Sequence, residues 1–370
     1  MIDYMTERIQ KLIDKGVKII DPRQTFISDE VDLNRIYTGC ILFPGTRLSG
    51  QRTLIGSFSK IGTEGYATLH DSIIGSGAEV ASGFLTGATL LPGATAGANC
   101  HFRAGTLLEE ETFTGHSVGL KQSILMYSVV AGSLINFCDV LISGGSSRRN
   151  HSEIGSGFIH FNFTPWGKHG DKATPSLIGN VIDGVFLDQE RIFLGGLSGM
   201  VGPCTVGFGA MTVAGQVIRE PVEAATMHSE VGHDFNKDFS SSEVKFSDKR
   251  LANICEKNID FIVQLYALKK WYSCIRLKRS EIQKNLELSL VLTGAIETIQ
   301  CCIKERIHRY NSFATEWSQP NIKEVELDLE NTKINIDWKP ELKYDEWIRA
   351  LSEEEKQELR LWLRKTTFPT

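Results

Sequence analysis

The stretch Met200-Val-Gly-Pro-Cys-Thr-Val-Gly-Phe-Gly-Ala-Met-Thr-Val-Ala-Gly-Gln-Val-Ile218 repeats one pattern every six residues. The period is kept by Met200, Val206, Thr212 and Ile218. A small residue, Cys204 or Ala210, stands four places after each of the first two. A six-residue repeat is too short for a helical pair or a propeller blade. It fits one flat face of a parallel β-helix, in which three hexapeptides close a triangular coil.

The same period is visible much earlier in the chain. Ile55-Gly56 and Ile61-Gly62 are six residues apart, and Ser59 stands in the small position between them. Ile74-Gly-Ser-Gly-Ala78 is followed by Val80 at the same spacing. The aliphatic residue is expected to point into a narrow core, while the small residue or glycine fits a tight corner. The sequence therefore predicts a mainly β solenoid whose sites lie on its outer faces or between copies.

Composition narrows the class of protein. The 370 residues carry 40 Lys and Arg against 45 Asp and Glu, and no basic run suggests binding to nucleic acid. The eight cysteines form no CxxC pair, so most are expected to be reduced core thiols, and no histidine spacing suggests a metal site. The first sixteen residues are charged throughout, and no apolar run looks long enough to span a bilayer. These features predict a soluble cytoplasmic protein without membrane partners.

Four regions are predicted along the chain. Residues 1–16 form a short helix, and residues 17–222 form the β-helix, with inserted loops at 143–150 and 164–175. Residues 223–247 form a linker. Residues 248–370 form a helical region, because apolar residues there fall at helical spacing and Ser352 with Glu355 reads as a capping box. The apolar stripe through Ile299 and Ile303 suits packing against a partner helix or against the solenoid.

Four segments resemble a known enzyme family. They are Gly16-Val-Lys-Ile-Ile-Asp-Pro-Arg-Gln-Thr-Phe-Ile-Ser28, Ile41-Leu-Phe-Pro-Gly-Thr-Arg-Leu-Ser-Gly50, Ile154-Gly-Ser-Gly-Phe-Ile-His-Phe-Asn-Phe163 and Val201-Gly-Pro-Cys-Thr-Val-Gly-Phe-Gly-Ala210. They look like the acetyltransferase half of the bifunctional UDP-N-acetylglucosamine pyrophosphorylase and glucosamine-1-phosphate acetyltransferase. The resemblance implies a left-handed β-helix of hexapeptide repeats. It also implies a homotrimer with pockets between neighbouring solenoids.

The resemblance implies substrate-binding residues, each matched by position. Arg103 and Lys121 match the Arg and Lys with which the family binds its sugar phosphate. Asn162 matches an Asn of the family, and Lys168 matches a Lys six residues further on. The catalytic His of the family falls on Ser133, and the Asp that follows falls on Asp139, so the expected base is missing.

Other residues are candidates for that base. N-acetylation requires the attacking amine to lose a proton, and a positioned base contributes roughly 10²–10⁴ in rate. His160 and His151 are the candidates, with Asp139 close upstream and His169 in the second loop. Strand alternation leaves two outcomes for His160: it faces outward, or, if Phe161 is outward, it is a core or corner histidine. Three other histidines are expected to be structural: His70, His101 and His116.

The polar insertion offers a further anion clamp. Arg148 and Arg149 could hold a phosphate or carboxylate, because guanidinium presents paired donors. Alternatively, the two arginines bind no ligand and form a solvated surface pair or a contact between subunits.

Two functions remain open from the sequence. The first is an acyl-CoA-dependent acyltransferase, using acetyl-CoA or another acyl-CoA, that acts on a sugar phosphate or nucleotide sugar. The second is a non-catalytic trimer that binds such a sugar or serves as a scaffold. Uridylyl transfer is not expected, because in the family it belongs to a nucleotide-binding domain placed before the solenoid, and no Gly-rich phosphate loop opens this chain.

Overall fold

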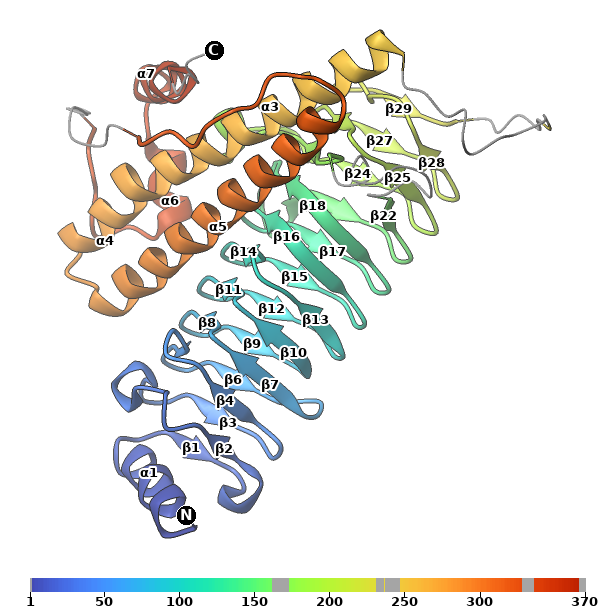
Figure 1. The fold of residues 1–370 in the computed structure, drawn as a ribbon. Helices are drawn as coiled ribbons and strands as arrows, with labels where there is room; N and C mark the ends of the chain where they lie inside the picture. Colours follow the sequence, from blue (N-terminus) through green and yellow to red (C-terminus); the bar gives the residue numbers. More distant parts are fainter. Residues whose placement is uncertain (1, 162–172, 231–235, 237–246, 328–335, 366–370) are drawn as a thin grey trace.

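The computed structural model describes residues 2–161, 173–230, 236, 247–327 and 336–365. Helix α1 (Ile2–Asp14) stands at one end of a long solenoid of parallel strands, and a group of helices lies along the other half (Figure 1). The prediction of a mainly β parallel solenoid with an N-terminal helix and C-terminal helices is confirmed.

Three faces build the solenoid. The first face is an 11-stranded sheet. Its strands are β1 (Lys18–Ile19), β3 (Ile41–Leu42), β6 (Lys60–Ile61), β9 (Glu79–Val80), β12 (Thr95–Ala96), β15 (Phe113–Thr114), β17 (Val130–Ala131), β21 (Glu153–Ile154), β24 (Phe193–Leu194), β27 (Met211–Thr212) and β29 (Met227–His228). A 16-stranded sheet forms the other two faces, because β16 (Gly119–Leu125) and β18 (Asn136–Ile142) turn the corner between them.

The second face and the third face divide the remaining strands of that sheet. The second face contains β2 (Phe26–Ile27), β4 (Arg47–Ser49), β7 (Ala67–His70), β10 (Gly83–Thr86), β13 (Cys100–Phe102), β22 (Ile159–Phe161), β25 (Gly199–Val201) and β28 (Val217–Ile218). The third face contains β5 (Leu54–Ile55), β8 (Ile73–Ile74), β11 (Thr89–Leu90), β14 (Leu107–Leu108), β23 (Ser176–Ile178) and β26 (Thr205–Val206). Every pairing within the three faces is parallel, as between β8 and β11.

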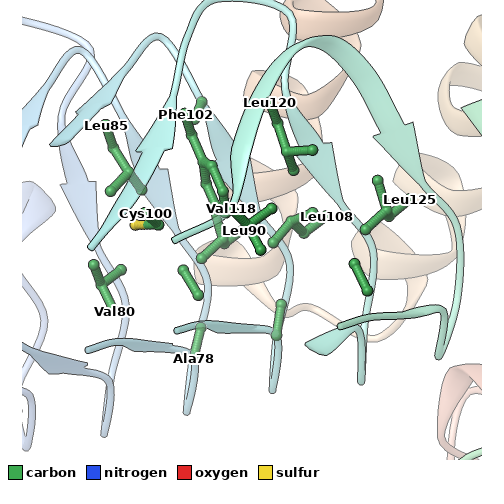
Figure 2. Close-up of a cluster of buried hydrophobic side chains, with 14 of the residues drawn as sticks. Ala78, Val80, Leu85, Leu90, Cys100, Phe102, Leu108, Val118, Leu120 and Leu125 are labelled. Atoms are coloured by element: carbon green, nitrogen blue, oxygen red, sulfur yellow. The ribbon is translucent and has the colours of Figure 1, made fainter. Parts of the chain in front are cut away.

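The inward side chains form one continuous apolar column. Val80, Leu85 and Leu90 come from the three faces of one coil, and none is exposed to solvent. Figure 2 shows them stacked with Phe102, Leu108 and other residues of the neighbouring coils. Ala78 is fully buried in the small position before Val80, as the repeat requires. The residues that recur every six positions in the sequence are therefore the ones that face the core.

The coil spacing changes where the chain carries an insertion. Phe113 pairs with Val130, 17 positions later, but Val130 pairs with Glu153, 23 positions later. The six extra residues belong to an antiparallel hairpin of β19 (Gly145–Ser147) and β20 (Asn150–His151). The next coil carries the short helix α2 (Val181–Gly184), and the predicted loop at 164–175 lies mostly outside the described residues.

The eight cysteines are all free thiols. Four are buried, at Cys40, Cys100, Cys204 and Cys302. Three are half-buried, and Cys301 is exposed. Burial raises the pKa of the Cys100 thiol to about 12, so it stays protonated at neutral pH.

A helical tail covers the third face. It consists of α3 (Asp248–Trp271), a π-helical turn (Tyr272–Arg276), α4 (Leu277–Ile282), α5 (Leu286–Glu316), α6 (Tyr344–Ala350) and α7 (Glu353–Arg364). Helices α3 and α5 run side by side, and α5 contacts β8, β11 and β14 (Figure 1). The outward residues of the third face join the apolar core of the tail. They include Leu54, Ile73, Leu107, Ile124 and Leu141. Helix α5 therefore packs both against α3 and on the solenoid, which are the two options that its apolar stripe left open.

Three local features of the tail follow from its sequence. The capping box of Ser352 and Glu355 is confirmed at the start of α7. Asn285 caps α5 by accepting a hydrogen bond from the Leu288 N–H, so Ile282 belongs to α4 and not to the helix that begins at Leu286. Helix α5 is long and apolar enough to cross a membrane by length and composition, which corrects the expectation that no such run exists. In the structure its apolar side packs on the solenoid instead.

The packing of the tail predicts that Leu107 and Leu108 are equally sensitive to truncation. Leu108 points inward and Leu107 points towards the tail, and neither is exposed. We expect Leu107→Ala and Leu108→Ala each to lower the free energy of unfolding by about 2–5 kcal/mol. Leu361→Ala, at a side chain that is 49% exposed, is the control and should change it by less than about 0.5 kcal/mol. Urea denaturation measures all three, and a Leu107→Ala variant as stable as the control would contradict the docking of the tail.

Candidate functional site

Arg103 and Lys121 lie on successive coils at the corner between the second and third faces. Arg103 follows β13, and its backbone N–H donates to the Leu120 carbonyl of the next coil. Lys121 is aligned with Cys138 one coil further on. The Arg103 guanidinium Nη2 reaches the Cys138 Sγ at 3.6 Å. The structure therefore brings the two predicted phosphate ligands to one edge of the solenoid.

Asp139 lies at the same corner, but its carboxylate is close to an arginine of the helical tail. Its Oδ1 lies 3.7 Å from Nη1 of Arg306 on α5, and the side chains are 14% and 1% exposed. Burial raises the pKa of the Asp139 carboxyl, while Arg306 and Lys121 oppose the shift. On the next turn of α5, Arg309 Nε donates to Glu305 at 2.9 Å. The corner thus combines four cationic side chains with two carboxylates.

His160 lies inside the solenoid. Only 4% of it is exposed, and its Nε2 is 2.8 Å from the Ser176 Oγ. Its neighbour Phe161 points outward and is 39% exposed, which is the alternative that makes His160 a core histidine. Burial lowers the pKa of His160 to about 4, so the ring is neutral at pH 7.

The hairpin residues stand apart from the Arg103 corner. The Arg148 guanidinium lies over the Phe113 ring of the first face, 5.5 Å from its centroid. His151 Nδ1 is 2.9 Å from the Arg148 carbonyl oxygen, and its Nε2 is 3.8 Å from a Glu153 carboxylate oxygen. Arg149 is exposed. Arg148 and His151 therefore lie against the first face.

Two predicted ligands cannot be placed. Asn162 and Lys168 lie outside the described residues, and so does His169 of the same loop. Among the residues that are described, no group of three or more His, Cys, Asp or Glu side chains is arranged to hold a metal ion.

A histidine that the sequence analysis treated as structural stands next to the position of the missing base. His116 Nδ1 is 2.8 Å from the Ser133 Oγ, at the corner between the first and second faces. Ser133 is held in turn, because its backbone N–H donates to the Ser156 Oγ of the next coil at 3.0 Å. His116 is exposed, so its second ring nitrogen can meet a ligand. The signal was available in the sequence: the two residues are 17 positions apart, which is one coil.

Comparison with known proteins points to the same family. The curated protein named Bifunctional protein GlmU from Thermus thermophilus is 34% identical over 194 residues, which is 52% of this chain and 37% of that protein. The chain is similar to GlmU. The GlmU of Nocardia farcinica is 31% identical over 219 residues, 59% of this chain and 38% of that protein. The GlmU of a Geobacillus species is 28% identical over 235 residues, 63% of this chain and 45% of that protein.

The matched region is only part of each GlmU sequence, so the similarity does not extend to the whole of those proteins. The chain spans about two fifths of the length of these GlmU relatives. The predicted resemblance is confirmed over about half of this chain, and the coverage is consistent with the acetyltransferase half. No protein-family model matches the chain.

Burial of His160 predicts a loss of stability in mild acid. In the unfolded chain the imidazole titrates near 6.5, and in the folded protein near 4, so between these values the unfolded state binds more protons. Lowering the pH from 7 to 5 should therefore cost about 2 kcal/mol through this group. His160→Gln removes the imidazole, so between pH 7 and pH 5 the free energy of unfolding of this variant should fall by about 2 kcal/mol less than that of the unmodified protein. Denaturant unfolding at the two pH values measures it, and equal pH dependence in both proteins would refute the buried neutral ring.

Proposed function

We propose that the chain is an acyl-CoA-dependent acyltransferase that modifies an amine on a sugar phosphate or a nucleotide sugar. One observation carries the proposal: His116 Nδ1 lies 2.8 Å from Ser133, the residue that matches the catalytic His of the GlmU family. The base that sequence matching found missing is supplied from the preceding coil. The likeness to GlmU supports the choice of substrate class.

The hydrogen bond to Ser133 gives His116 a definite role. If Nδ1–H donates to the Ser133 oxygen, the proton-free nitrogen is Nε2, and Ser133 orients the ring. Nε2 then takes a proton from the attacking amine. The amine nitrogen forms a bond to the thioester carbonyl carbon, the carbon–sulfur bond breaks, and the CoA thiolate leaves and takes up the proton that His116 Nε2 accepted. Backbone N–H groups at coil corners suit the developing oxyanion.

Arg103 and Lys121 are proposed to hold the phosphate of the substrate. Both lie at one corner in register, and guanidinium and ammonium groups are the usual partners of phosphate oxygens. Arg306 and Arg309 of α5 offset the charges of Asp139 and Glu305 beside them. A phosphate would therefore meet a corner with net positive charge.

The two halves of the proposed site need a second copy of the chain. Ser133 lies in the corner before β18, and Cys138 is the third residue of that strand, so their corners are separated by no more than about 16 Å. The resemblance to this family implies a trimer with pockets between neighbouring solenoids. A homotrimer would bring His116 of one copy close to Arg103 and Lys121 of the next.

The alternative is a non-catalytic trimer that binds the sugar phosphate or acts as a scaffold. The engagement of Asp139 by Arg306 favours it, because this candidate base is not open to a substrate. Binding of glucosamine 1-phosphate without release of CoA would support this alternative.

Acyl transfer tests the role of His116 directly. With acetyl-CoA and glucosamine 1-phosphate, the full chain should release CoA thiol, and His116→Ala should slow the release by about 10²–10⁴-fold. His308→Ala, at an exposed histidine of α5, is the matched control and should retain the rate. Arg103→Ala with Lys121→Ala should abolish sugar-phosphate binding in calorimetry. Unchanged release by His116→Ala, or unchanged affinity in the double variant, contradicts the assignment.

Oligomeric state is a separate prediction. Sedimentation equilibrium should give the mass of three chains of 41.2 kDa. Mixing the inactive His116→Ala variant with the inactive Arg103 and Lys121 double variant should restore part of the activity, because mixed trimers rebuild some complete sites. A strictly monomeric protein would remove the basis for the shared site.

A further inference from the structure

A cavity of about 670 Å³ lies between the solenoid and the tail. One wall consists of successive coil corners between the third and first faces, including Ser57, Ser76 and Glu111. The other wall comes from the connection between α4 and α5 and from the start of α6. This volume suits a small ligand, and cavities between two packed units are common binding sites. The corner is neither that of Arg103 nor that of Ser133, so the cavity is separate from the proposed acyltransfer site.

Negative charge dominates the lining of the cavity. Five carboxylates contribute, namely Glu110, Glu111, Glu287, Glu341 and Asp345. Two cations oppose them, Arg279 and Lys343. The Arg279 guanidinium is already committed to backbone oxygens, since it donates to the carbonyls of Trp338, Lys339 and Leu342. Outside the lining, Arg276 pairs with Glu110 and Arg349 pairs with Asp345, so the carboxylates left to attract a cation are those of Glu111, Glu287 and Glu341.

A buried network of ion pairs and hydrogen bonds holds Glu110 in the solenoid wall of the cavity. Arg276, on the π-helical turn, donates from Nη2 to Glu110 Oε1, and its Nη1 lies 3.6 Å from Glu109. Tyr272 donates its hydroxyl hydrogen to Glu109 at 2.7 Å. The second oxygen of Glu110, Oε2, is buried and finds no hydrogen-bond partner within the described part of the chain. That oxygen is closed to solvent, so a ligand in the cavity does not reach it, and Glu110 contributes to the site through its charge.

Tyr127 supplies evidence for a ligand that is independent of the carboxylates. The residue is only 9% exposed, and its backbone N–H donates to Glu109 Oε2 at 2.9 Å. Across the residues that the structure describes, its hydroxyl makes no hydrogen bond, although it lines the cavity. Burial raises the pKa of the Tyr127 hydroxyl, and the nearby Asp345 carboxylate adds to the shift. The phenol is thus a neutral group that faces carboxylates and lacks a partner.

We propose that this cavity binds a small molecule that carries a primary ammonium group. An ammonium presents three donors and a positive charge. It can donate to the Tyr127 oxygen and pair with the carboxylates of the lining, and it offsets their excess. Because the cavity has one wall from the solenoid and one from the tail, the bound amine holds the two units together. It therefore acts on the docking of the tail and not on the acyl transfer itself.

Putrescine is a suitable probe, with 1,4-butanediol as the neutral analogue of the same length. Calorimetry on the full chain should show saturable binding of one putrescine per chain and none of the diol. Tyr127→Phe should weaken putrescine binding by about fivefold, as expected for one hydrogen bond. Glu111→Gln combined with Glu341→Gln should weaken it further. Glu354→Gln, at an exposed carboxylate of α7 outside the cavity, should leave the affinity unchanged.

Several outcomes overturn the proposal. One is the absence of saturable binding by putrescine; another is equal binding by the butanediol. A third is an affinity that the Tyr127 and Glu111 with Glu341 variants leave unchanged. A fourth is magnesium chloride alone matching putrescine in affinity and in its response to the variants, which would assign the cavity to a metal ion. The double variant replaces exposed side chains, so it remains informative if Tyr127→Phe fails to fold. Release of CoA thiol is measured in parallel, so failure of the amine site and failure of the acyltransferase proposal are distinguished.

Discussion

The contact between the third face and helices α3 and α5 is the interaction on which the rest of the molecule depends. The solenoid coils turn aliphatic side chains both inward and outward along this face, as Leu107 and Leu108 do. Burial of an apolar side chain is worth about 1.5–3 kcal/mol, and an exposed row of them would be a liability. The tail covers that row, and in doing so it leaves the first and second faces as the open faces.

This contact also decides the electrostatics of the candidate site. Arg306 comes to Asp139 because α5 crosses the corner between the second and third faces. Arg276 reaches the pair Glu109 and Glu110 from the π-helical turn. π-helical turns are rare and occur frequently at functional sites. The charged residues of the tail are therefore placed by apolar packing, and their chemistry follows from it.

The fold could be predicted because inward residues repeat locally, whereas the site depends on contacts across coils. Val80 and Ile218 reveal the core by period alone. Leu107 was missed because a six-residue pattern marks only its inward neighbour. His116 and Ser133 meet although they are 17 residues apart, since coil length sets that register. The burial of His160 depended on which way Phe161 points, and strand alternation alone left that choice open.

Helix α5 crosses β8, β11 and β14, while α3 contacts β23. In a bare solenoid each coil touches only its immediate neighbours, so unfolding can begin at an end and spread. A rigid rod laid across many coils couples them, because no single coil can detach without also disturbing the helices. The half of the molecule under the tail should therefore open as one cooperative unit, while the uncovered coils near α1 fray independently.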